Sequence, residues 1–303
     1  MAARRHWRRV DGVLLLDKSC GMSSNAALQA ARRLFGAARA GHTGTLDPLA
    51  SGLLPLCFGE ATKFSSDLLG ADKSYQAEVC FGVRTDTGDA EGAVLSRQTV
   101  SLLPTELDAA LGRFRGPITQ VPPMYSALKR DGRPLYELAR RGITVDREAR
   151  QVCIHELRLL AFTGDSCRLY VSCSKGTYVR TLAVDLGEAL GCGAHVSALR
   201  RVAVGALAIA DAWTIERIAA LPEERRHDCL LAADTLVQTL PAVDLDEAEG
   251  RRFARGNPVP ASGTGGRRRV YSVGRFLGVG ELDPLGKLHP RRVVDSSSPS
   301  AGD

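Results

Sequence analysis

The sequence lacks the motifs that mark most metal, disulfide and nucleotide-cofactor proteins. It has eight cysteines in 303 residues but no C-x-x-C pair, and its six histidines are scattered. These features favour reduced core cysteines in a cytoplasmic protein, with no zinc site and no disulfide framework. A glycine-rich phosphate loop with its lysine is also missing, which argues against a bound nucleotide. We therefore expect neither a metal nor a cofactor.

Long apolar runs are missing as well. The first apolar run, residues 13–16, is too short for a signal peptide or a membrane span. Four arginines lie within the nine residues at the start of the chain. Residues 1–10 are therefore predicted to be a basic tail, and a transit peptide is the alternative.

Lysine is scarce, yet the chain is basic. Its 34 arginines and 6 lysines outweigh the acids, which gives a net charge of +6 and a pI near 9.0. This balance favours an anionic partner, and nucleic acid is the commonest one. The alternative is a basic soluble enzyme that binds no polyanion. Hydrophobic residues make up 44% of the chain, which is enough for a globular core.

Residues 41–55 are the stretch around which the chain is organised. Three glycines and two prolines within these fifteen residues predict a shaped loop in place of a regular helix or strand. The only acid of the loop is Asp47, which Pro48 biases towards an extended backbone. An acid on a stiff, partly buried loop is a candidate catalytic carboxylate. The alternative is an Asp that hydrogen-bonds its own turn.

Hydrophobic periodicity predicts an α+β fold. Strands and helices alternate irregularly, and the strands are expected to pair mainly antiparallel, which argues against a doubly wound parallel sheet. Strands are predicted over residues 12–17, 54–58, 73–81, 152–162, 167–173 and 196–204. Helices are predicted over residues 24–35, 59–69, 104–114, 135–141 and 179–190, and a long loop over 116–129. Arg200 and Arg201 are expected to be exposed on their strand or at its edge.

The pattern changes near residue 240. Residues 241–296 carry a second set of short strands and turns, with a basic cluster at 267–269, and are predicted to form a small β-rich domain. Residues 11–240 would then form the larger domain. Residues 297–303 are predicted to be disordered.

Taken with its neighbours, the loop resembles the bacterial TruB-type tRNA pseudouridine synthases. The resemblance rests on an ordered series of motifs between about residues 11 and 204, after which it fades. The motifs are GVLLLDK at 12–18, GMSS at 21–24, GHTGTLDPLA at 41–50, GEATK at 59–63, DKSY at 72–75, RTDT at 84–87, MYSALK at 124–129, SKGTYVR at 174–180, GAHV at 193–196 and LRR at 199–201. Ser19 and Cys20 depart from the family pattern, which often has Pro after the Asp-Lys pair.

The resemblance implies a pseudouridine synthase fold with a PUA-like terminal domain, and an isomerase that needs no cofactor, metal or energy input. In this reaction the N-glycosidic bond of a uridine breaks, the base turns over, and C5 joins C1′. The resemblance makes Asp47 the essential carboxylate and Arg180 the cation that keeps it ionised. Tyr75 would stack on the target base and is a candidate proton acceptor. A surface arginine and an ordinary strand aromatic are the alternatives for Arg180 and Tyr75.

Five further residues are candidates for substrate binding by the same resemblance. His42 would help to flip the uridine out and would take its place in the stack. Tyr178 would wall the pocket, and Leu199 would contact the base. Lys18 and Lys63 are candidates for phosphate or loop contacts. Backbone-bonded, core or solvated side chains are the alternatives.

The implied substrate is the T-loop uridine at position 55 of tRNA, bound by its T arm and acceptor stem. The protein is expected to act as a monomer. Two other functions remain open: a tRNA folding chaperone that needs no chemistry, and a structural RNA-binding module. The complete set of Asp47, Tyr75, Tyr178 and Arg180 argues against the module, because a carboxylate in an RNA groove would repel phosphate.

Overall fold

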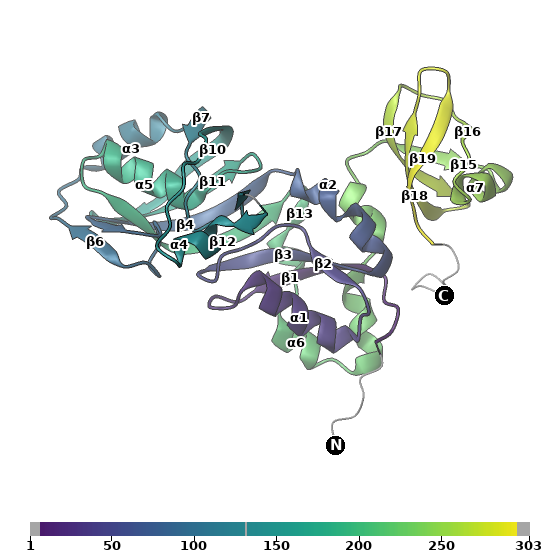
Figure 1. The fold of residues 1–303 in the computed structure, drawn as a ribbon, viewed down its shortest axis with the longest axis horizontal. Coiled ribbons are helices and arrows are strands. Elements are labelled where there is room, and N and C mark those ends of the chain that lie inside the picture. Colours follow the sequence, from purple (N-terminus) through teal and green to yellow (C-terminus); the bar gives the residue numbers. More distant parts are fainter. Residues whose placement is uncertain (1–6, 131, 296–303) are drawn as a thin grey trace.

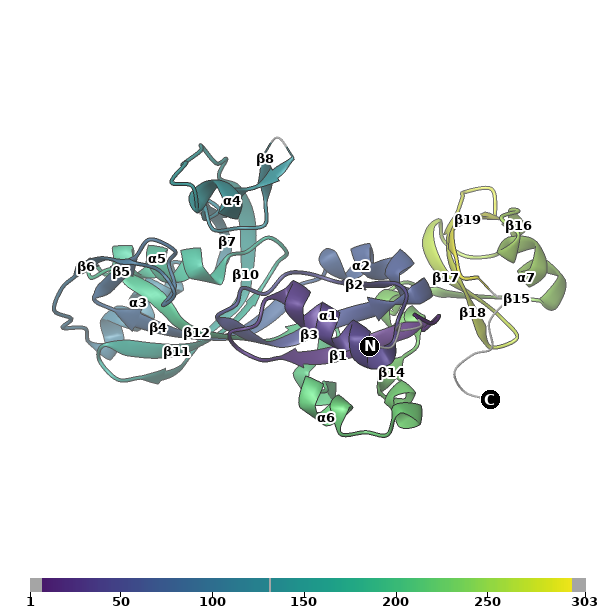
Figure 2. The ribbon, with the colours of Figure 1, turned by 60° about the horizontal axis from the view of Figure 1, so that its bottom comes forward.

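Two β-sheets organise the molecule in the computed structural model, which describes residues 7–130 and 132–295 (Figures 1 and 2). The large sheet has ten strands in the order β14-β1-β3-β12-β4-β11-β10-β7, with β13 attached to β12 and β2 to β3. All of its pairings are antiparallel except β12 with β3. This confirms the predicted α+β class. The predicted basic tail falls partly, and the predicted disordered tail wholly, outside the described residues.

One half of the large sheet is apolar on both faces. β1 (Gly12–Lys18) pairs antiparallel with β3 (Ala50–Phe58) along its whole length, and β2 (Ala40–His42) pairs with the end of β3. Helix α1 (Ser24–Phe35) covers one face; Ser23 caps it and Gly36 ends it in the left-handed region at φ 63°. The other face is covered by a 3-10 helix (Gly59–Phe64), which runs into α2 (Ser65–Leu69).

The prediction of a loop over residues 41–55 is wrong for its second half. Strand β3 begins at Ala50 and lies between β1 on one side and β2 and β12 on the other. Gly52 adopts φ +100°, which only glycine reaches without strain, and this conformation lets β12 approach closely. Pairing on both edges outweighs the local preference of Gly and Pro. The irregular loop is residues 43–49.

The other half of the large sheet is covered by helices on one face. Strand β4 (Lys73–Phe81) alternates as predicted, with Ala77, Val79 and Phe81 buried. It pairs with β11 (Ser166–Cys173) and β12 (Ala194–Val204), and β11 continues to β10 (Arg150–Phe162). Helices α3 (Pro104–Gly112) and α5 (Val179–Ala189) pack on this half. A small hairpin, β5 (Val83–Thr85) with β6 (Val94–Arg97), stands beside it.

The predicted long loop over residues 116–129 starts as a strand. β7 (Gly116–Gln120) pairs with β10 as the last strand of the large sheet. Residues 121–149, called the insert below, then leave the sheet and project from it (Figure 2). The insert carries β8 (Lys129–Arg130), β9 (Arg133–Pro134) and α4 (Leu135–Ala139).

Residues 205–240 return along the β1–β3 half. They comprise β13 (Leu207–Ala208), α6 (Ile215–Ala219), β14 (Leu230–Leu231) and three 3-10 helices at Ile209–Asp211, Glu223–Cys229 and Ala233–Val237. β14 extends the sheet at β1, and α6 packs beside α1.

The C-terminal domain is β-rich as predicted and lies at one end of the molecule (Figure 1). Its sheet has the order β15-β17-β18-β19-β16, with bounds Ala242–Leu245, Gly266–Ser272, Arg275–Leu282, Lys287–Val293 and Val259–Pro260. Helix α7 (Glu247–Ala254), capped by Asp246, was not expected. The predicted basic cluster is largely engaged within the protein: Arg267 pairs with Asp67, and the buried Arg268 donates to Thr264. No helix in the described part is long and apolar enough to cross a membrane.

The close approach at Gly52 gives the first prediction. A Cβ at this position would lie 2.3 Å from the Arg201 carbonyl oxygen and 2.8 Å from its nitrogen. We expect Gly52→Ala to lower the free energy of unfolding by roughly 2–4 kcal/mol, because both backbone strain and a steric clash result. Urea denaturation measures this change. Gly41→Ala is the control, since no atom lies within 4 Å of its added Cβ. Equal stability of the two variants would contradict the prediction.

Candidate active site

The loop carrying Asp47 is fixed by contacts with the segment after β1. The Ser24 hydroxyl donates to the Leu46 carbonyl at 2.9 Å and accepts from the Leu46 N–H at 2.8 Å. The Gly21 N–H donates to the Pro48 carbonyl at 2.8 Å. These bonds hold the residues on both sides of Asp47, so the carboxylate projects from a rigid support.

Asp47 meets Arg180 across the site. The guanidinium nitrogen Nη2 of Arg180 lies 2.9 Å from Oδ2 of Asp47. The side chain of Arg180 is only 6% exposed, whereas that of Asp47 is 38% exposed. The pair therefore joins a fixed cation to a carboxylate that a substrate can still reach.

Arg180 also binds a second acid, Asp89, which the sequence analysis missed. Its Nη1 lies 3.3 Å from Oδ2 of Asp89, and the Asp89 side chain is 5% exposed. Nη1 donates to the Thr87 carbonyl at 3.0 Å, and Nη2 to the Tyr125 carbonyl at 2.6 Å. The RTDT motif, which ends two residues before Asp89, was the available signal, but nothing in the sequence linked it to Arg180.

Opposing effects set the protonation of Asp47. Burial raises the pKa of Asp47, Arg180 lowers it, and the negative charge of Asp89 raises it again, with a net upward direction. The expectation that Arg180 keeps the carboxylate ionised therefore describes only one of these effects. The balance leaves Asp47 a stronger base than a solvent-exposed aspartate.

Tyr75 and Leu199 lie between the two halves of the large sheet. Both side chains pack against the apolar clusters of the β1–β3 half and of the helix-covered half. Tyr75 is half-buried on β4, and burial raises the pKa of its phenol, which the charge of Asp47 raises further. On the sheet Leu199 pairs with Ala50, three residues after Asp47, and Tyr75 pairs with Arg201, which binds the Gly44 carbonyl of the same loop.

Tyr178 directly precedes α5 and joins the site to the insert. Its N–H donates to Oε1 of Gln120 at 3.1 Å, and Nε2 of Gln120 donates to its carbonyl at 3.3 Å. Burial raises the pKa of the Tyr178 phenol. The root of the insert is thus held by Tyr178 and, through the Tyr125 carbonyl, by Arg180.

The remaining candidates lie in different surroundings. Burial lowers the pKa of His42, so its ring is neutral near pH 7. Lys18 is buried and donates to the carbonyls of Met22 at 2.6 Å and Ser19 at 3.0 Å, which are loop contacts. Lys63 contacts Glu60 and the Val293 carbonyl, which lies at the end of the last strand of the C-terminal domain. Its predicted phosphate contact remains a prediction.

Arg201 is buried, so the prediction that it is exposed is wrong. It is 2% exposed and is one of the largest fully buried side chains. Its Nε donates to the Leu53 carbonyl at 2.7 Å and its Nη2 to the Gly44 carbonyl at 3.2 Å, so it ties the loop carrying Asp47 to β3. On the sheet it lies opposite Tyr75. Arg200, its neighbour, instead forms a half-exposed pair with Asp17 at 2.6 Å.

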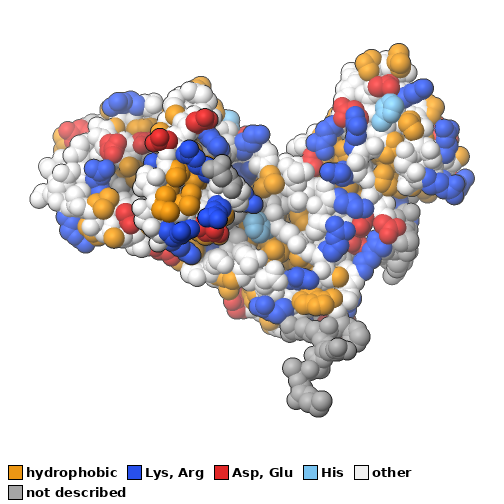
Figure 3. All heavy atoms as spheres, in the orientation of Figure 1, with side chains coloured by type: hydrophobic (Ala, Val, Ile, Leu, Met, Phe, Trp, Pro, Cys, Tyr) orange, Lys and Arg blue, Asp and Glu red, His pale blue; other side chains and the backbone are white. Residues whose placement is uncertain are grey.

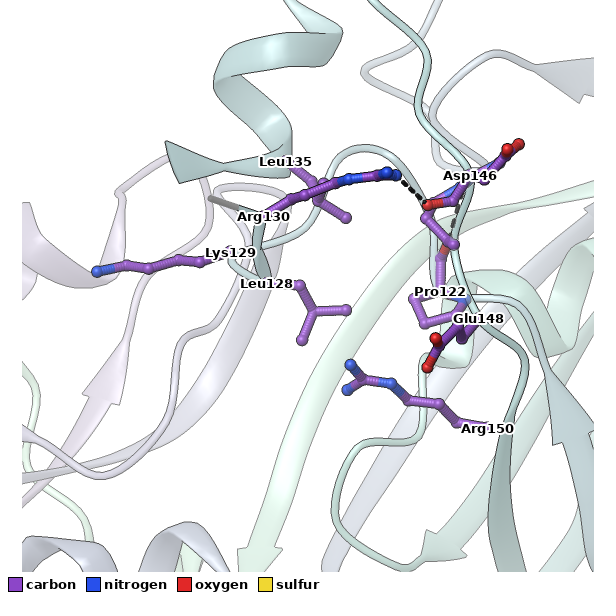
Figure 4. A pocket seen from close by; sticks show the side chains of 9 residues that line it. Pro122, Leu128, Lys129, Arg130, Leu135, Asp146, Glu148 and Arg150 are labelled. Carbon is purple, nitrogen blue, oxygen red and sulfur yellow. Dashed lines mark hydrogen bonds between the residues drawn. The ribbon is translucent and has the colours of Figure 1, made fainter. Parts of the chain in front are cut away.

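A pocket of about 520 Å³ lies at the base of the insert. In Figure 4 the apolar side chains of Pro122 and Leu128 and the guanidinium of Arg150 face the same space. The insert that carries this pocket is bonded at its root to Tyr178 through Gln120 and to Arg180 through the Tyr125 carbonyl. Its lining residues are Pro122, Leu128, Lys129, Arg130, Leu135, Asp146, Arg147, Glu148 and Arg150.

Positive side chains gather on the insert and on the C-terminal domain in the view of Figure 3. The exposed ones on the insert are Lys129, Arg130, Arg133, Arg140 and Arg141. Those on the C-terminal domain include Arg251, Arg252, Arg255, Arg291 and Arg292. Exposed cations on two projecting parts of one molecule fit a large polyanion better than a small anionic ligand.

The fold is shared with solved structures. The archaeal box H/ACA sRNP Nop10–Cbf5 complex contains a chain that matches with a TM-score of 0.71 at 21% identity. This match covers 95% of the present chain and 86% of the other. At this identity the similarity establishes the fold.

Family models identify the chain more closely. Residues 32–179 match the N-terminal domain of the TruB family pseudouridylate synthases, residues 180–238 the C-terminal domain of tRNA pseudouridylate synthase B, and residues 241–294 the C-terminal region of pseudouridine synthase II TruB. The fold and these matches define a pseudouridine synthase, an isomerase. The chain belongs to the TruB family.

Close relatives extend the similarity over nearly the whole chain. It is 56% identical to tRNA pseudouridine synthase B of Dechloromonas aromatica (strain RCB), over 97% of this chain and 99% of the relative. It is 55% identical to the protein of the same name from Aromatoleum aromaticum, over 96% of each. The impression that the resemblance fades after residue 204 is therefore wrong. The gap between the last two family models, at residues 238 and 241, lies beside the boundary that we propose at 240.

The tether made by Arg201 gives the second prediction. Arg201→Met would leave the buried carbonyl of Leu53 and the part-buried carbonyl of Gly44 without this donor. We expect the free energy of unfolding to fall by about 2–4 kcal/mol and turnover to drop, because unpaired buried carbonyls are costly and the loop loses its anchor. Chemical denaturation and initial rates measure the two effects. Arg200→Met is the matched control and is expected to cost about 1 kcal/mol or less, since its ion pair is half exposed. A larger loss for Arg200→Met would contradict the assignment.

Proposed function

We propose that this protein is a tRNA pseudouridine synthase that converts the T-loop uridine at position 55 to pseudouridine, with Asp47 as the essential carboxylate. The names of its relatives support the tRNA substrate. The observation that carries the catalytic role is the 2.9 Å contact between the accessible Asp47 and the buried Arg180.

The reaction exchanges one bond to the sugar for another. The bond from C1′ to N1 of the uracil breaks, the base turns over, and C1′ bonds to C5. The proton on C5 leaves, and N1 gains a proton, so the product is an isomer of the substrate. Asp47 would attack C1′ or the base, or would promote loss of the base, and all three routes need its ionised form beside the sugar. Arg180 would hold that carboxylate in place, with Asp89 fixing the far side of the guanidinium.

The neighbouring side chains fit the handling of a flipped base. A neutral His42 could stack in the space that the uridine leaves in the RNA. The ring of Tyr75 would cover the flipped uracil, with Leu199 and Tyr178 completing its apolar wall. Tyr75 is also the candidate proton acceptor at the sugar. Lys18, which binds loop carbonyls, would support the loop from behind.

RNA would be held beyond the site by the exposed cations of the insert and of the C-terminal domain. Single-stranded loops are read through unstacked bases, and basic residues follow the backbone. We assign the insert to the T arm, since its root is bonded to Tyr178 and Arg180. We assign the C-terminal domain to the acceptor stem.

Asp47→Asn tests the proposal. Wild type is expected to release tritium from unmodified tRNA labelled at C5 of its uridines, and the variant to lose this release by at least 1,000-fold while it still binds tRNA. The loss follows because an amide can neither attack carbon nor accept a proton. A tRNA folding chaperone would keep its activity in Asp47→Asn. Absence of release by wild type, on tRNA with an intact T loop, would overturn the enzymatic function for this substrate.

The rate should also depend on pH through Asp47. Burial raises the pKa of Asp47 above 3.8, so turnover should fall as the pH drops through a value higher than that of a free aspartate. The charge of Asp89 contributes to this rise, and Asp89→Asn should therefore move the acid limb of kcat to lower pH, in addition to lowering the rate. Single-turnover rates between pH 4 and 8 measure the shift. An acid limb that stays in place or moves to higher pH in Asp89→Asn would contradict it.

A further inference from the structure

We propose that Gln120 is a positioning residue for the reaction: its buried side-chain amide caps the start of α5 from outside the helix and so holds Arg180 where it meets Asp47. The inference deepens the proposed function and rests on it. Gln120 takes no part in making or breaking bonds, and it acts through the backbone of Tyr178 and the helix that follows.

Gln120 brings a fixed amide to the start of α5. It is the last residue of β7, where it pairs with Arg150 of β10, and it is only 2% exposed. A buried amide is costly unless its oxygen and nitrogen are hydrogen-bonded. Here both groups bind one residue: Oε1 accepts from the Tyr178 N–H at 3.1 Å, and Nε2 donates to the Tyr178 carbonyl at 3.3 Å. The side chain thus bonds the Tyr178 backbone as a neighbouring strand would.

Helix α5 has no side-chain cap of its own. The first N–H groups of a helix lack partners inside it, and the side chain of the preceding residue usually supplies one. Tyr178 holds that place in an extended conformation and makes no such bond, and the first turn carries no acid. The Tyr178 carbonyl accepts the first helical bond, from the Leu182 N–H at 3.0 Å. Gln120 therefore fixes, from a distant strand, the residue at which the helix begins.

The position of Arg180 depends on this first turn. Arg180 is the second residue of α5, and its Nη2 lies 2.9 Å from Oδ2 of Asp47. The same Nη2 donates to the Tyr125 carbonyl at 2.6 Å. Residues 120–125 and 178–180 are thus bonded to each other at both ends, by the Gln120 amide and by Arg180. A misplacement of about 1 Å at a reacting site can lower a rate roughly 100-fold, so loss of one of these two bonds should reduce turnover.

The same geometry predicts a change in the pH dependence. Burial raises the pKa of Asp47, Arg180 lowers it, and Asp89 raises it again. If Arg180 is displaced, its lowering effect weakens and the pKa of Asp47 rises further. The reaction needs the ionised carboxylate, so the acid limb of kcat should move to higher pH, opposite to the shift expected for Asp89→Asn. The groups that interact electrostatically with Asp47 are Lys18, Tyr75, Asp89, Tyr178 and Arg180.

Gln120→Met tests the assignment, because it keeps a side chain of similar size and removes both hydrogen bonds. We expect kcat for tritium release from unmodified tRNA to fall at least tenfold, KM to change less than threefold, and the acid limb of kcat to move to higher pH. Gln98→Met is the matched control, since Nε2 of Gln98 donates to the Gly191 carbonyl at 2.8 Å, just beyond the other end of α5. It should change neither the rate, nor KM, nor the acid limb.

Gln120→Asn covers the case in which Gln120→Met does not fold. Its amide is one methylene shorter and cannot reach both groups of Tyr178, so kcat and the acid limb should move in the same directions by smaller amounts. An unchanged kcat, a loss confined to KM, or a lower kcat with an acid limb that stays in place would overturn the positioning role.

Hydrogen exchange separates this result from a failure of the proposed function. In Gln120→Met the backbone amides of Tyr178 and Leu182 should exchange at least fivefold faster than in wild type, because both belong to the hydrogen bonds that Gln120 fixes. Gln98→Met should leave their exchange unchanged. If wild type releases no tritium from tRNA, the proposed function fails, whereas unchanged exchange in Gln120→Met would overturn the cap made by Gln120.

Discussion

The buried guanidinium of Arg180 between two carboxylates is the interaction on which the site depends. It binds Asp47 from the loop after β2 and Asp89 from the turn after β5, and it also fixes the backbone at the root of the insert. A buried arginine needs its donors satisfied, and here the substrate-facing acid provides one of the acceptors. A change at Asp47 would therefore leave a buried charge short of a partner.

A second buried arginine performs the complementary task. Arg201 binds backbone carbonyls of the loop and of β3, so it holds the loop without neutralising the acid it carries. Arg201 and the Ser24 hydroxyl hold the backbone of the loop, whereas Arg180 holds the Asp47 carboxylate. Strand β3 then continues from the loop to the contact with the C-terminal domain.

Local patterns predicted much of the fold. The strand over residues 73–81 and the helix that Ser23 caps and Gly36 ends agree with the structure, because alternation and capping are set by near neighbours. The predictions failed where distant segments decide the outcome. Residues 50–53, ahead of the predicted strand at 54–58, become part of β3 because β1 and β12 pair with them, and residues 116–120 form a strand because β10 pairs with them. The helix at 247–254 was not predicted, because the segments around it read as short strands and turns.

The sequence by itself determined the family, the reaction class and the candidate acid, because a series of motifs in fixed order can be recognised without knowing which residues are in contact. It also named Arg180, Tyr75 and Tyr178 by resemblance. Only the tertiary structure brought Asp89 to Arg180 and buried Arg201, and only it engaged Lys63 with the end of the last strand. The physical reason is that the partner of a charged side chain is chosen by the folding of distant segments, and a linear pattern carries no record of that choice.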